Sequence, residues 1–115
     1  MEKQILNLEN GLEMMGGDKE LYRELIEEFI KTDGIDLEEL TNLTNAHDYT
    51  TAATKVHRVK GSSATIGGER LQEICAQAEA IFRGKVEGDP LPLLPEIDKR
   101  YKEFIAELKK ALEKL

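Results

Sequence analysis

Apolar residues recur at helical spacing in several separate stretches of this chain, and this pattern most constrains its fold. Residues three or four apart share one face of a helix, so each stripe predicts a helix with one buried side. β-Branched residues are scattered and no alternating run is flanked by hairpin dipeptides, so no strand is predicted. The clearest stripe lies near the C-terminus and comprises Leu94, Ile97, Tyr101, Phe104, Leu108 and Leu112.

Glycine pairs and a proline cluster separate the striped stretches. Thr32-Asp33-Gly34 interrupts one of them, but Leu37, Leu40 and Leu43 resume the stripe nearly in phase, so one long helix, kinked or straight, is favoured over two shorter ones. We therefore expect an all-α fold in a single domain spanning residues 1–115: an up-and-down antiparallel four-helix bundle with a short additional N-terminal helix. The short helix lies within about 10–15, and the core helices cover roughly 18–45, 48–66, 69–84 and 94–113.

Composition excludes several classes of function. The chain has 115 residues and a formal net charge of −7, which argues against nucleic acid or an anionic membrane surface as a partner. Its single cysteine, Cys75, cannot form an intrachain disulfide and is expected in the core. No apolar run has the length of a membrane span and no signal-peptide pattern opens the chain, so a cytoplasmic location is expected. We also expect a monomer, because no apolar stripe is left without a partner in the bundle.

The stretch from Ala53 to Gly67 is the first candidate for function. In a helix, His57 has Lys60 and Gly61 as neighbours one turn away and Ala64 two turns away. Glycine within a helix costs about 1 kcal/mol relative to alanine, so Gly61 suggests that another molecule comes close to the imidazole. Lys60 is placed to neutralise an anion on that ring.

Other catalytic machinery is not indicated. The chain has no Gly-rich phosphate loop, no dinucleotide fingerprint and no HExxH motif. His47 and His57 are not at a metal-ligand spacing, and Ser62 and Ser63 lack a Ser-His-Asp arrangement. The sequence thus predicts neither an ATP site nor a bound cofactor or metal.

The segment His57-Arg-Val-Lys60-Gly61-Ser-Ser-Ala-Thr-Ile-Gly67 resembles the signature His-x-x-Lys-Gly-x-x-x-x-x-Gly of histidine-containing phosphotransfer (HPt) domains. The resemblance extends over nearly the whole chain, including Gly11-Leu12, Gly16-Gly17-Asp18, Leu21-Tyr22 through Phe29, and Leu71 through Glu79. Val56, where the family more often has Ala, and Gly34 depart from the family pattern.

This resemblance implies a phosphorelay carrier rather than an enzyme. His57 would accept a phosphoryl group through Nε2 from a receiver-domain aspartate and pass it to another receiver aspartate. Lys60 would stabilise phosphoryl charge, Gly61 would give clearance, and Glu79 could bond the other ring nitrogen. The implied partners are response-regulator receiver domains and, in some pathways, a hybrid histidine kinase, with Mg²⁺ on the receiver only. Partner-binding positions would be Ala53, Arg58, Ala64 and Gly67.

Three alternatives stay open at this point. A chemotaxis-kinase type of phosphotransfer domain, phosphorylated from ATP by a separate catalytic domain, shares the motif. A docking adaptor that is never phosphorylated would use the same bundle, although such a domain would typically lack the histidine. An enzyme with His57 as general base is the third, but no convergent carboxylate is indicated.

Overall fold

The computed structural model describes residues 2–32 and 34–115, and the regular elements within these ranges are all helices. Met1 of the N-terminal leader and Asp33 of the expected interruption lie outside the described residues. The helices are α1 (Leu8–Met14), α2 (Lys19–Thr32), α3 (Leu37–Asn45), α4 (Tyr49–Thr65), α5 (Glu69–Phe82) and α6 (Leu93–Lys114).

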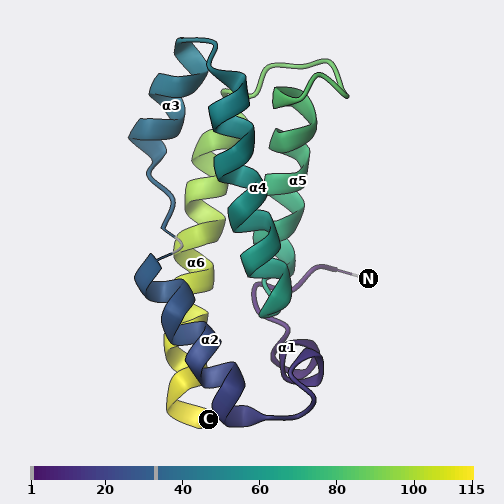
Figure 1. Cartoon of the computed structure of the whole chain (residues 1–115), viewed down its shortest axis with the longest axis vertical. Coiled ribbons are helices and arrows are strands. Elements are labelled where there is room, and N and C mark those ends of the chain that lie inside the picture. Colours follow the sequence, from purple (N-terminus) through teal and green to yellow (C-terminus); the bar gives the residue numbers. More distant parts are fainter. Residues whose placement is uncertain (1, 33) are drawn as a thin grey trace.

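The helices pack as a bundle of four columns (Figure 1). The first column is α2 followed by α3, and the other three are α4, α5 and α6. The helices α4 and α5 pack side by side along most of their length, and α6 runs along much of the molecule against α2, α3 and α5 (Figure 1). Successive columns alternate in direction (Figure 1). The predicted all-α fold is thus confirmed. Within the described residues, no helix has both the length and the apolar character needed to cross a membrane.

The apolar stripes meet in one continuous core. The rings of Phe29 and Phe104 pack edge to face, with centroids 5.3 Å apart, and so join the first column to α6. Cys75 is fully buried, as expected. Among the described residues, the hydrophobic side chains with no exposed surface come from four helices: Tyr22, Ile26, Ala52, Val56, Cys75, Ala78, Ile97, Phe104 and Leu108.

The predicted long helix over 18–45 is wrong, because α2 ends at Thr32 and α3 begins at Leu37. Residues 34–36 are not helical. The Asp36 side chain accepts a hydrogen bond from the backbone N–H of Glu39 and so caps a new helix. Across the break, Arg58 of α4 donates from Nη2 to the carbonyl oxygen of Thr32 at 3.0 Å. A carbonyl at the end of a helix has no partner within its own helix, so a hydrogen bond from another helix stabilises the end of α2.

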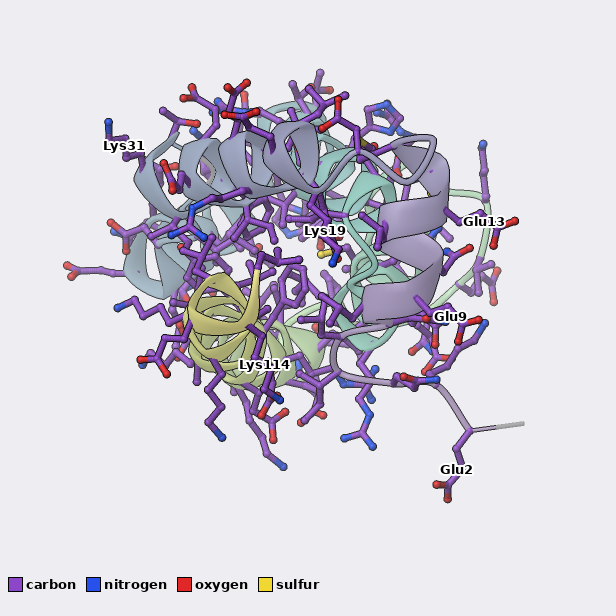
Figure 2. The ribbon with its side chains drawn as sticks, turned by 90° about the horizontal axis from the view of Figure 1, so that it is seen from below. Glu2, Glu9, Glu13, Lys19, Lys31 and Lys114 are labelled. Carbon is purple, nitrogen blue, oxygen red and sulfur yellow. The ribbon has the colours of Figure 1, made fainter. Side chains whose placement is uncertain are left out.

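The N-terminal leader crosses the turn between α4 and α5. Glu69, in the first turn of α5, accepts hydrogen bonds from the backbone N–H of Gln4 and from Nδ2 of Asn7, both at 2.9 Å. Arg70 donates from its backbone N–H to the Gln4 carbonyl. The leader thereby fixes α1 beside one end of the bundle, where the labelled Glu9 and Glu13 point outward (Figure 2).

Candidate functional site

Helix α4 presents His57 to solvent because the opposite side of the helix is apolar. Asp48 starts the helix by accepting a hydrogen bond from the N–H of Thr51. Ala52, Val56, Val59 and Ser63 are buried. The side chain of His57, by contrast, is 60% exposed.

The exposed imidazole is held from beneath by a buried carboxylate on α5. Nδ1 of His57 lies 3.0 Å from Oε2 of Glu79, whose side chain is only 9% exposed. Helices α4 and α5 pack closely along their length, and this packing brings together two residues 22 positions apart in sequence. The expectation that Glu79 contacts a ring nitrogen is confirmed.

Two cationic side chains also contact this carboxylate. Lys60 Nζ lies 2.7 Å from Oε1 of Glu79, and Arg83 Nε lies 2.7 Å from Oε2. Burial by itself would raise the pKa of Glu79, but the contacts with Lys60 and Arg83 and the nearby His57 outweigh it and lower the pKa from 4.5 to about 2. Glu79 is therefore an anion at neutral pH.

The charge of Glu79 fixes the tautomer of His57. An ionised carboxylate only accepts hydrogen bonds, so Nδ1 carries the ring proton and donates it to Glu79. In the neutral ring, the lone pair then lies on Nε2. The site thus contains an exposed imidazole with Nε2 as its nucleophilic atom.

Gly61 has no packing role that explains a glycine. A Cβ built at this position meets no atom within 4 Å among the described residues, and the backbone angle φ is not positive. The residue is exposed and lies one turn from His57, within α4 and about one turn before its end at Thr65. The fold would therefore accept a side chain here, although the space beside the imidazole would be reduced.

Gly67 differs from Gly61, because its own surroundings require glycine. Its φ is +97°, and a Cβ would overlap the backbone of Asn7. Gly67 is also buried, and its carbonyl oxygen accepts a hydrogen bond from the N–H of Asn7 at 2.8 Å. Gly67 therefore holds the N-terminal leader against the turn between α4 and α5. The geometry does not support the expectation that Gly67 contacts a partner, because the residue is buried.

The other residues expected at a partner surface are distributed unequally. Arg58 is exposed and bonds to the Thr32 carbonyl, while Ala64 is half-buried. Ala53 is 1% exposed, so it lies in the core and offers no surface for a partner. Ser63 is likewise buried, and its hydroxyl donates to the Lys60 carbonyl, as the core interpretation of this serine requires.

Arg83 was missed by the sequence reasoning. The available signal was its position four residues after Glu79, the spacing at which opposite charges pair on a helix. That spacing alone does not distinguish this pair from surface pairs such as Arg23–Glu27. No group of three or more His, Cys, Asp or Glu residues that could hold a metal ion occurs in the described part of the chain.

The chain is thus a small helical bundle that presents an exposed histidine over a buried carboxylate. The family model described as "Hpt domain" matches residues 24–115. The chain therefore belongs to the Hpt domain family, whose members are histidine phosphotransfer carriers in phosphorelays and pass phosphoryl groups to response-regulator receivers. Neither the curated proteins nor the solved structures compared with the chain gave a match.

Proposed function

We propose that His57 is the phosphoacceptor of a phosphorelay carrier. The observation that supports this most strongly is the exposed ring whose Nδ1–H is held by the buried, ionised Glu79. Fixing the proton on Nδ1 leaves the Nε2 lone pair in the solvent-exposed imidazole, where a partner can reach it. The donor and the next acceptor are the aspartates of two response-regulator receiver domains.

The transfer step balances without a further reactant. The Nε2 lone pair of neutral His57 forms a bond to phosphorus, and the bond from phosphorus to the aspartyl oxygen breaks with its electron pair going to that carboxylate. The ring keeps its Nδ1 proton and gains one positive charge. Glu79, 3.0 Å from Nδ1, stabilises this charge as it develops. In the second transfer the same steps run in reverse, and the phosphoryl group passes from Nε2 to the aspartate of the next receiver.

Lys60 and Gly61 assist this reaction from the same helix. The ammonium of Lys60 offsets charge on the transferring phosphoryl group, which carries most of its charge on the peripheral oxygens. Gly61 leaves open the space through which the partner's acidic edge approaches the ring. Any Mg²⁺ belongs to the receiver, and the chain acts as a monomeric, cytoplasmic carrier without an ATP site of its own.

A label-transfer assay tests this function. A receiver domain carrying a labelled aspartyl phosphate is mixed with the wild-type chain and with His57→Gln. The chain's other histidine supplies the matched control, His47→Asn, because asparagine tolerates the positive φ of 57° at that position. We expect acid-labile, base-stable label on the wild type and on His47→Asn, and none on His57→Gln.

The same assay separates the alternatives. If several phosphorylated receivers leave a folded wild-type chain unlabelled while a kinase catalytic domain with ATP labels it, the chain is phosphorylated by a kinase rather than by a receiver. If neither donor labels it, the adaptor explanation replaces the proposal.

A further inference from the structure

The carboxylate of Glu79 contacts three side chains that are cationic or donate a proton in a hydrogen bond. Its oxygen Oε2 accepts hydrogen bonds from His57 Nδ1 and from Arg83 Nε. Oε1 lies 2.7 Å from Lys60 Nζ and accepts no hydrogen bond of favourable angle among the described residues. Lys60 and Arg83 therefore contact different oxygens of the same carboxylate, and both offset its negative charge.

This arrangement conflicts with the role of Lys60 in transfer. A lysine that neutralises the phosphoryl group has to turn away from Glu79 toward Nε2 of His57. Leaving a buried carboxylate without a cation is strongly unfavourable, because the carboxylate has already lost its hydration. Lys60 can leave only if another cation stays with Glu79.

We propose that Arg83 is the residue that holds the charge of Glu79 while Lys60 moves to the phosphoryl group. This inference rests on the proposed function of His57. Arg83 lies four residues after Glu79, at the end of α5, and its bond goes to the oxygen that Lys60 does not contact. It can therefore remain in place throughout transfer, as a positioning residue that does not itself touch the reacting atoms.

The charges at the site support such an exchange. Before transfer, one carboxylate faces two cations and a neutral ring, so the cluster of His57, Lys60, Glu79 and Arg83 carries one net positive charge. By analogy with other phosphorylated side chains, the transferred phosphoryl group carries about two negative charges. Bond formation at Nε2 also makes the ring positive. Lys60 then gains a stronger anionic partner near Nε2, while the ring cation and Arg83 both remain beside Oε2. Until the ring becomes positive, however, Arg83 is the one cation of this cluster that can stay with Glu79 when Lys60 turns away.

A double-mutant cycle tests the inference. Single-turnover rates of label transfer from a phosphorylated receiver are measured at saturating receiver for wild type, Arg83→Gln, Glu79→Gln and the double variant. A neutral glutamine at position 79 still accepts from His57 but needs no balancing cation. We therefore expect Arg83→Gln to slow transfer about tenfold when Glu79 is present and less than about threefold in the Glu79→Gln background, as coupled neighbours require.

Two further variants show that the positive charge at position 83 matters. Arg83→Lys keeps a cation and should restore most of the rate. The control Arg23→Gln removes an exposed Arg–Glu pair of the same four-residue separation and should leave the rate unchanged. Circular dichroism confirms that each variant is folded.

The outcomes distinguish this inference from the function on which it rests. If the wild type is labelled on His57 and Arg83→Gln transfers at the wild-type rate or faster, the inference fails while the function stands. An equal slowing in the wild-type and Glu79→Gln backgrounds also overturns it, because Arg83 would then act directly on the partner. If wild type is not labelled at all, the proposed function fails first.

Discussion

The ring nitrogen Nδ1 of His57 lies 3.0 Å from Oε2 of Glu79, and so an exposed imidazole is anchored to a carboxylate whose side chain is only 9% exposed. The contact joins α4, whose His57 side chain faces solvent, to α5, whose Glu79 side chain is buried. It fixes both the orientation of the ring and the position of its proton. The chemistry of the site therefore depends on two helices rather than on the sequence motif alone.

Glu79→Gln should weaken the acid sensitivity of the fold. The pKa of Glu79 is lowered from 4.5 to about 2, so its ionised form is favoured by folding. A lowered pKa stabilises the protein above the unfolded-state value, and this contribution is lost as pH falls from about 4.5 through about 2. Its full size is on the order of 3 kcal/mol. Urea unfolding at several pH values should show a smaller loss of stability in that window for Glu79→Gln than for wild type.

The surface carboxylate of Glu107 provides the control for this measurement. Glu107→Gln should lose stability with falling pH as the wild type does. Equal acid profiles for Glu79→Gln and wild type would show that the buried carboxylate contributes no proton linkage.

Gly61→Ala should stabilise the fold, whereas a larger residue at the same position should severely slow transfer. A Cβ at this position meets no atom of the described chain, and alanine favours the helix by up to about 1 kcal/mol. Gly61→Gln should fold normally yet lose most of its transfer rate, because its side chain occupies the space beside His57. Thermal unfolding measures the first effect and label transfer the second. Normal transfer by Gly61→Gln would remove the clearance role.

Gly67→Ala should have the opposite effect on stability. Its positive φ and the overlap of a Cβ with the Asn7 backbone predict a loss of more than about 1 kcal/mol, together with release of the leader. Hydrogen exchange should show faster exchange at the N–H of Gln4 and Asn7, two residues that bond to Glu69 and Gly67. A variant as stable as wild type, with those amides still protected, would contradict this account of the turn.

Lys60→Ala should slow transfer without unfolding the bundle. The Lys60 side chain is 29% exposed, and Arg83 and His57 still contact Glu79 when it is removed. Lys102→Ala, which removes an exposed lysine from α6, is the control and should transfer normally. Circular dichroism reports the fold and label transfer reports the rate. Loss of the helical signal in Lys60→Ala would instead make this lysine structural.

Local patterns in the sequence were sufficient to predict most of the fold. The expected ranges 48–66, 69–84 and 94–113 agree with α4, α5 and α6 to within one or two residues at each end. The break before α3 was missed because Leu37 and Leu40 continue the stripe nearly in phase with α2, and periodicity does not register an extended segment of compatible length. The supporting contacts, such as that of Arg58 with Thr32, come from another part of the chain.

Spacing along the sequence predicted the candidate site only where its residues share a helix, whereas the contact of His57 with Glu79 on α5 was expected from the family resemblance. His57, Lys60 and Gly61 follow from spacing along α4, since neighbours three and four apart lie together. The Arg83 contact and the burial of Ala53 depend on how α4 packs in the bundle, which spacing does not specify. The two glycines were expected to differ, with Gly61 inside the helix and Gly67 in the glycine pair that ends it, and the φ of +97° at Gly67 agrees with this expectation. The close approach of the Asn7 backbone to Gly67 could not be predicted, because it depends on where the leader packs.

Nitrogen NMR of the phosphorylated chain tests the central claim most directly. The protein is labelled with ¹⁵N-histidine, phosphorylated from a receiver, and examined for one-bond coupling between ³¹P and a ring nitrogen. The account predicts coupling to Nε2 of His57, with a proton retained on Nδ1 both before and after transfer. Phosphorus on Nδ1 of His57, or on His47, would contradict it.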